Sequence, residues 1–120
     1  MDAKTLLQTA TVLLAIAALG GLAMAIMRFA GADRPPSWLA MLHGLLAGSG
    51  LTLLIYGGLT IGIARNAWMG IAMLVIAALG GVVLNLAYHD KRLPLPKGFV
   101  IVHALLAVGG FGLICLSAFR

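Results

Sequence analysis

Carboxylates and cysteine are the scarcest reactive groups in this sequence. Asp2, Asp33 and Asp90 are its only acidic residues, glutamate is absent, and Cys115 is the single cysteine. One cysteine excludes an intrachain disulfide. None of the three aspartates lies within a long apolar run. This argues against a proton- or cation-coupled small exporter, which needs an ionisable group at membrane depth.

Charged residues of either sign make up only 9% of the chain, whereas hydrophobic residues make up 62% and the mean hydropathy is +1.12. So little polar surface cannot cover a water-soluble globule of this size. Apolar runs at residues 5–29, 38–63, 67–88 and 98–119 each approach or exceed the length of about 20 residues that crosses a bilayer. We therefore expect an all-α integral membrane protein with four transmembrane helices.

The sequence repeats itself without a gap at an offset of 60 residues. The motif IAALGG occupies residues 16–21 and again residues 76–81, and His43 returns as His103. Most other positions differ between the two copies; Arg28, for example, corresponds to Tyr88. A match that survives this divergence favours a shared role for the two histidines.

An offset of two spans gives each half of the chain one helix in each direction. Residues 1–60 and 61–120 are therefore expected to form two helical hairpins, related as a parallel repeat within a single transmembrane domain. Short connections predict an up-down-up-down bundle in which the second and fourth helices are parallel and diagonal.

The cationic residues flank the apolar runs on two sides. The first and third connections, residues 31–37 and 89–97, define with the adjoining helix ends what we call the basic end. Its five cations are Arg28, Arg34, Lys91, Arg92 and Lys97, against Lys4, Arg65 and Arg120 at the opposite end. The net charge of +5 is thus explained by membrane topology rather than by nucleic-acid binding. We expect the basic end to be cytoplasmic, in a prokaryotic plasma (inner) membrane.

Two histidines lie at equal depth in the second and fourth expected helices, His43 and His103. On diagonal helices their imidazoles approach the bundle axis from opposite sides, which is the geometry of bis-histidine haem ligation. Two alternatives remain open: histidines satisfied by hydrogen bonds in the packing, and another metal or proton role. His89 has no counterpart in the repeat and is expected at the membrane edge, and Asn85 is expected to hydrogen-bond a neighbouring helix, a quinone or a porphyrin.

Glycine pairs in the first and third helices are predicted to leave room for a porphyrin at about the depth of the histidines. These are Gly20 with Gly21 and Gly80 with Gly81. Haem propionates need cationic or hydrogen-bonding partners, and Arg28, Arg34 and Lys97 are available at the basic end. No Cys-x-x-Cys-His motif occurs, so covalent attachment is excluded.

In arrangement, though not in detailed sequence, the chain resembles the four-helix haem core of membrane cytochrome b subunits from quinol-oxidising complexes. In that family the second and fourth helices carry the axial histidines, and glycines on the first and third helices accommodate the haem. The family carries a further histidine about 14 residues along each ligating helix. Gly57 and Ser117 stand there in this chain, so we expect one haem b and no complete electron path across the membrane.

The first hypothesis is therefore a haem-b electron-transfer or anchor subunit, rather than an independent enzyme, that passes electrons between a partner and the quinone pool. An alternative is a cofactor-free structural or accessory subunit of a larger membrane complex. A further alternative is a small transporter. Besides the lipid bilayer, the expected partners are other membrane subunits or a second copy of the chain, with no role for nucleic acid.

Overall fold

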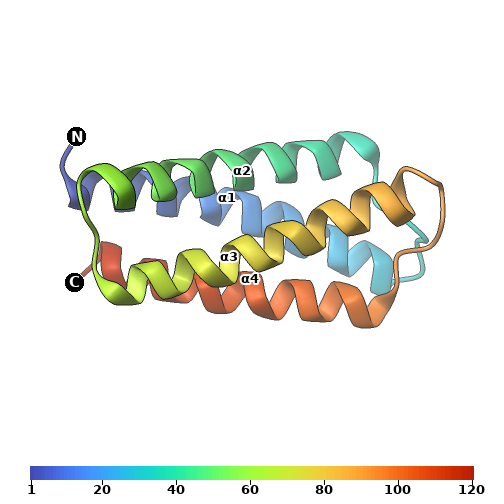
Figure 1. The fold of residues 1–120 in the computed structure, drawn as a ribbon. Coiled ribbons are helices and arrows are strands. Elements are labelled where there is room, and N and C mark those ends of the chain that lie inside the picture. Colours follow the sequence, from blue (N-terminus) through green and yellow to red (C-terminus); the bar gives the residue numbers. More distant parts are fainter.

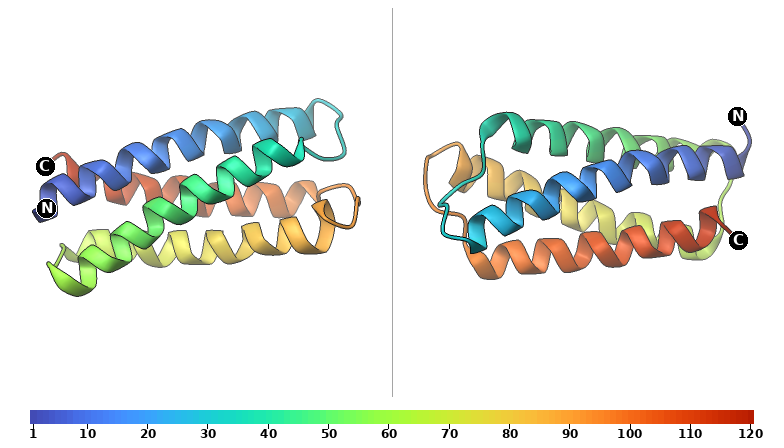
Figure 2. Two further views of the ribbon diagram at one scale, coloured as in Figure 1. Left: turned by 90° about the horizontal axis from the view of Figure 1, so that it is seen from above. Right: turned by 180° about the vertical axis from the view of Figure 1, so that it is seen from behind.

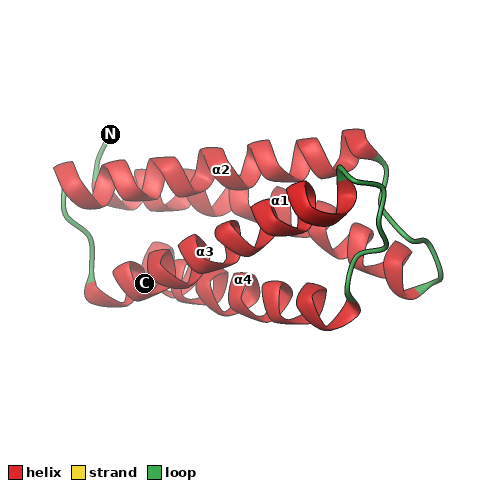
Figure 3. Ribbon diagram, turned by 45° about the vertical axis from the view of Figure 1, so that its right-hand side comes forward, coloured by secondary structure: helices red, strands yellow, loops and turns green.

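The computed structural model describes all 120 residues, and its regular structure is entirely helical. The helices are α1 (Ala3–Phe29), α2 (Ser37–Thr60), α3 (Arg65–Val83) and α4 (Lys97–Ala118), and a π-helical turn, η1 (Leu84–His89), continues α3. There is no strand (Figure 3). Each helix, with η1 counted as part of α3, is long and apolar enough to cross a membrane. The prediction of an all-α chain with four potential spans is confirmed.

The helices form an elongated bundle of 43 × 22 × 20 Å. The closest pairings are α1 with α2 and α3 with α4, and the two pairs join through α1 with α4 and, less extensively, α2 with α3. Helices α2 and α4 therefore lie on a diagonal. Both chain termini and the α2–α3 connection lie at one end of the bundle, and the other two connections lie at the far end (Figures 1 and 2).

Most apolar side chains point outward. Only 17–33% of the most apolar window of each helix is buried inside the chain, and large side chains such as Leu19, Leu45 and Leu105 are more than 60% exposed. Such a surface cannot face water, because a soluble monomer does not expose apolar patches of this extent. The apolar helices indicate a lipid bilayer as their environment and a multi-pass membrane protein.

Helix ends follow local chemistry. Helices α1 and α2 end before Gly31 (φ 120°) and Gly62 (φ 91°), which adopt the left-handed conformation that glycine tolerates without a steric penalty. Helices α2 and α4 start directly after Pro36 and Pro96, whose fixed φ suits a helix start. Asp2 caps α1 by accepting a hydrogen bond of 2.7 Å from the backbone N–H of Thr5.

Apolar packing is concentrated in the half of the bundle toward the opposite end. A cluster of nine buried residues drawn from all four helices fills it: Leu7, Ala10, Leu14, Leu54, Ala67, Ile71, Leu74, Ile114 and Ala118. Toward the basic end the only cluster is smaller and comprises Leu84, Leu95 and Val100. Between this small cluster and the large core lie the two histidines.

Candidate functional site

His43 lies six residues after Ser37, the first residue of α2, and its imidazole is half-buried. Its Nδ1 is 2.7 Å from the backbone carbonyl oxygen of Ala17 in α1. A carbonyl oxygen can only accept, so Nδ1 carries the proton and donates it. In the neutral ring this leaves Nε2 with a free lone pair, and no hydrogen bond in the structure uses it.

His103 repeats this arrangement in the second half of the chain. It lies six residues after Lys97, the first residue of α4, and its Nδ1 is 2.7 Å from the carbonyl oxygen of Ala77 in α3. Ala17 and Ala77, like the two histidines, are 60 positions apart. The two halves therefore fix the ring orientation and tautomer of their histidines in the same way.

The two imidazoles meet across the bundle. Their ring centroids are 6.3 Å apart and the ring planes are inclined at 75°. Since α2 and α4 lie on a diagonal, the side chains reach toward each other from opposite corners. The structure thus brings together the two residues that the sequence singled out as metal ligands.

The predicted cofactor-binding glycines contact these same rings. A Cβ added to Gly21 would lie 2.9 Å from Cε1 of His43, and one added to Gly81 would lie 3.2 Å from Cε1 of His103. Gly20 is more open, with His43 Cβ 3.7 Å away, and Gly80 faces Phe99 at 3.4 Å. The space that Gly21 and Gly81 leave by lacking a side chain admits the edges of the two imidazoles. That the predicted glycines also accommodate a porphyrin stays a prediction.

The predicted propionate partners lie at the basic end and bind backbone groups of the two connections. Arg28 Nε donates to the Leu95 carbonyl at 2.8 Å, and Arg34 Nη1 donates to the Arg92 carbonyl at 3.0 Å. Lys97 Nζ lies 5.6 Å from the centre of the Phe29 ring, a cation–π contact. These bonds link the two halves of the chain at the end nearer the histidines.

Other candidate ligands lie elsewhere. No cluster of three or more His, Cys, Asp or Glu side chains occurs, so no third side chain of these types lies beside the two histidines. His89 Nε2 donates to the Pro35 carbonyl at 2.8 Å and so helps to join the connections. Asn85 is exposed on the π-helical turn η1 and its side chain has no hydrogen-bond partner in the structure.

The positions where a second pair of haem ligands would stand are closed by packing. A Cβ on Gly57 would lie 2.5 Å from Leu6 Cδ2, and the Ser117 hydroxyl is buried without a hydrogen-bond partner. Nothing in the structure explains that unpaired hydroxyl. The large apolar core fills this depth of the bundle.

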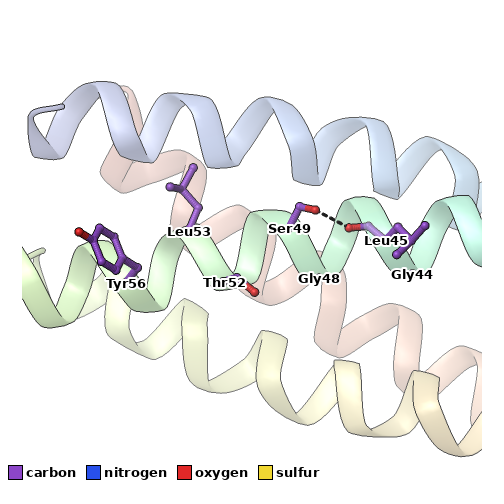
Figure 4. A pocket seen from close by; sticks show the side chains of 7 residues that line it. All are labelled: Gly44, Leu45, Gly48, Ser49, Thr52, Leu53 and Tyr56. Atoms are coloured by element: carbon purple, nitrogen blue, oxygen red, sulfur yellow. Dashed lines mark hydrogen bonds between the residues drawn. The ribbon is translucent and has the colours of Figure 1, made fainter.

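A separate groove lies apart from the histidine pair. It has a volume of about 590 Å³ and is lined by one helix, α2, through Gly44, Leu45, Gly48, Ser49, Thr52, Leu53 and Tyr56 (Figure 4). The Ser49 hydroxyl there donates to the Leu45 carbonyl at 2.7 Å. A smaller groove of about 290 Å³ between α3 and α4 includes His103, Gly80 and Phe99. The imidazoles are the groups whose chemistry defines the candidate site, and the groove on α2 contains none.

Sequence reasoning missed the two backbone carbonyls that orient the rings. The signal was present, because Ala17 with Gly21 and Ala77 with Gly81 are i, i+4 pairs of small residues on one helix face. A small residue at each of these positions lets a neighbouring side chain reach the backbone. Phe99, which packs against Gly80, had no such signal.

Comparison of the chain with models of protein families, with curated proteins and with solved structures finds no match.

Proposed function

We propose that this chain is a membrane electron-transfer or anchor subunit that holds one haem b, without a covalent bond, between His43 and His103. One observation carries the proposal. Two imidazoles on diagonal helices have centroids 6.3 Å apart, each with Nδ1 donating to a carbonyl and with Nε2 left without a partner. The orienting hydrogen bond on the remote nitrogen is the usual arrangement for a metal-ligating histidine.

The separation of the rings suits a shared metal. A metal–nitrogen bond of about 2.0–2.1 Å and about 1.1 Å from a ring nitrogen to the ring centre put each centroid about 3.2 Å from the metal. Two such rings on opposite sides of one metal would have centroids about 6.4 Å apart. The observed 6.3 Å agrees with this value.

The chain's residues define the environment of this site. Donation from Nδ1 to Ala17 and Ala77 fixes each tautomer and increases the basicity of Nε2. The surrounding apolar side chains limit access of water. Haem b, when bound, supplies reversible one-electron chemistry. With a single ligand pair near the basic end, an electron must enter and leave by partner molecules, which we take to be another subunit and a membrane quinone.

Arg28, Arg34 and Lys97 are the groups that we assign to the propionates. Each guanidinium already donates to a backbone carbonyl and keeps further N–H groups for an anion. Lys97 is exposed beside them at the start of α4. The same residues would then neutralise the propionates and link the two connections.

The proposed architecture is an up-down-up-down bundle of two hairpins, residues 1–60 and 61–120, related as a parallel repeat. Support comes from contacts that recur at the repeat offset: His43 with Ala17, and His103 with Ala77. We place the basic end in the cytoplasm of a prokaryotic cell, because cytoplasmic connections carry an excess of Lys and Arg.

A cofactor-free accessory subunit is the second candidate, and the outer face of α2 favours it. Gly44 and Gly48 lie one turn apart, and a Cβ added to either would have no neighbour within 4 Å. Small residues at this spacing let another membrane helix approach closely. Under this hypothesis the histidines are packing residues whose Nδ1 groups are satisfied by hydrogen bonds.

The test is a dithionite-reduced minus air-oxidised visible spectrum of the chain, produced in haem-supplemented cells and purified in mild detergent. We expect a sharp α band and a shifted Soret band, with one haem per chain by pyridine haemochromogen analysis. A featureless spectrum from folded, helical protein would reject haem binding and make the accessory subunit the leading candidate.

A further inference from the structure

The basic end carries five cationic side chains, those of Arg28, Arg34, Lys91, Arg92 and Lys97, and only two carboxylates, those of Asp33 and Asp90. Lys91, Arg92 and Lys97 are exposed. The hydrogen bonds of Arg28 and Arg34 go to backbone carbonyls, which carry no formal charge. The positive charge of this surface is therefore not neutralised within the chain.

Arg92 adopts a backbone conformation that its residue type does not favour. It is the only non-glycine residue with positive φ, at 58°, whereas the ends of α1 and α2 use Gly31 and Gly62 for the equivalent left-handed step. Glycine or asparagine would occupy this turn at lower cost. The turn itself is held by the backbone: the N–H of Arg92 donates to the His89 carbonyl and its carbonyl accepts from Arg34. The fold gains nothing there from the arginine side chain, which is exposed.

Exposed apolar side chains lie among these cations. Phe29 is 48% exposed, Trp38 67% and Leu93 47%. Lys97 lies over the Phe29 ring, so cationic and apolar groups adjoin directly. A surface that mixes both kinds matches the interfacial layer of a bilayer, where phosphate groups lie above acyl chains. If the binding partner were instead a water-soluble acidic protein, the exposed apolar side chains would have no role in binding it.

We propose that the basic end is a binding site for the phosphate headgroup of an anionic phospholipid, with Lys91 and Arg92 as its main contacts. The ammonium and guanidinium groups donate to the phosphate oxygens, and the neighbouring Trp38 and Leu93 contact the glycerol and the upper acyl chain. Arginine provides a planar pair of N–H donors that matches two phosphate oxygens. This gain offsets the unfavourable backbone conformation at Arg92. The proposal is independent of haem.

The experiment reconstitutes the chain in nanodiscs made from an equal mixture of phosphatidylglycerol and phosphatidylcholine, and then measures the lipids retained after mild detergent extraction by native mass spectrometry. We expect about three- to tenfold enrichment of phosphatidylglycerol on the unaltered chain, since each cation near a membrane surface contributes to attraction of anionic lipid. K91Q/R92Q should lower this to the bulk ratio.

The matched control is R65Q/R120Q, which removes two cations from the opposite end and should keep the enrichment. Equal enrichment in the unaltered chain and K91Q/R92Q, or equal loss in both double variants, would overturn the proposal. A further arm adds inorganic phosphate to the chain in pure phosphatidylcholine. If that raises the Tm as much as phosphatidylglycerol does, the surface takes a free anion and the lipid proposal fails.

Arg92→Asn separates the conformational effect from the charge effect. In pure phosphatidylcholine the variant should melt about 3 °C higher than the unaltered chain, because asparagine tolerates the left-handed turn. In phosphatidylglycerol its gain in Tm over phosphatidylcholine should be smaller than that of the unaltered chain. A variant that keeps the full lipid-dependent gain would show that Arg92 does not contact the headgroup.

Discussion

The two ends of the bundle are built from the same four helices but packed in different ways. Toward the opposite end, Gly70 and Gly110 bring the backbones of α3 and α4 so close that a Cβ on either would lie 2.9 Å from the other's carbonyl oxygen. Toward the basic end, Gly21 and Gly81 face imidazole rings rather than backbone. Glycine therefore serves helix contact at one end and admits a polar side chain at the other.

The difference sets the histidine level apart as the candidate site within an otherwise apolar chain. The nine-residue core consists of aliphatic side chains and contains no imidazole. At the histidine level, two ring nitrogens are committed to carbonyls and two remain available. An imidazole at membrane depth carries a desolvation cost. The proposed haem would use the two free nitrogens and so offset that cost.

The largest expected effect comes from removing either imidazole. His43→Ala and His103→Ala should each abolish the α band of the purified chain, because one remaining ligand cannot hold a six-coordinate low-spin haem without a covalent bond. The measurement is the reduced minus oxidised spectrum with haem stoichiometry. His89→Gln is the control, since its amide can still donate to the Pro35 carbonyl and it lies away from the pair. Haem retained in either alanine variant would reject bis-histidine ligation.

A smaller, graded effect is expected from the glycines beside the rings. Gly21→Ala places a methyl group 2.9 Å from His43 Cε1, so the ring must move and its bond to Ala17 must weaken. Overpacking of this kind costs about 1–3 kcal/mol, which corresponds to roughly 5- to 150-fold faster loss of haem. The measurement is transfer of haem to apomyoglobin. Gly81→Ala, at 3.2 Å, should have a weaker effect in the same direction.

Gly20→Ala is the matched control for that series. Its Cβ would lie 3.7 Å from His43 Cβ, an ordinary van der Waals distance. Both substitutions gain the same helix propensity, about 1 kcal/mol relative to glycine, so their difference isolates the contact with the ring. Equal haem-loss rates in Gly20→Ala and Gly21→Ala would show that ring placement does not limit haem retention.

The opposite end should respond in stability alone. Gly70→Ala would place a methyl group 2.9 Å from the Gly110 carbonyl oxygen, which belongs to the backbone and cannot rotate away. We expect a loss of about 1–3 kcal/mol in the free energy of unfolding, measured by helical circular dichroism in mixed micelles with increasing dodecyl sulfate. The folded fraction should keep an unchanged α band. Gly112→Ala, where no atom lies within 4 Å of the new Cβ, is the control.

The contrast between the two ends was only partly predictable from the sequence. Hydropathy and run length predicted the four helices. With η1 counted as part of α3, the predicted spans begin and end within three residues of the observed ones. Prolines and glycines mark four of the eight helix boundaries: the ends of α1 and α2 and the starts of α2 and α4. The π-helical turn at Leu84–His89 had no sequence signal, because residues 24–29 of the first copy form a regular α-helix.

At the site, the pattern predicted residue identity better than it predicted contacts. The repeat singled out His43 and His103, and their role in haem ligation stays a prediction. The sequence pattern could not predict which atoms the imidazoles would hydrogen-bond. The position of a residue on a helix face gives the direction of its side chain, but not the depth at which that side chain meets the backbone of a neighbouring helix. The carbonyls of Ala17 and Ala77 became visible only once the helices were packed.

The smallest effect is expected at Asp2, the fully exposed cap of α1 at the opposite end. The backbone N–H of Thr5 donates to its carboxylate and lowers the pKa of Asp2 below its ordinary value of 3.8, and the Thr5 side chain and the nearby positive charges add to the shift. Because the folded pKa is depressed, the cap contributes stability above the ordinary pKa, and this contribution is lost as the pH falls through the folded value. Acidification from pH 6 to below the folded pKa should therefore speed amide hydrogen exchange in the first turn of α1, after correction for the intrinsic pH dependence of exchange.

Asp2→Asn, which still caps the helix but does not titrate, should remove the pH dependence and keep most of the protection. An equal response in both proteins would assign the effect to another group, whereas an α band that shifts over the same pH range would show that the two ends are coupled.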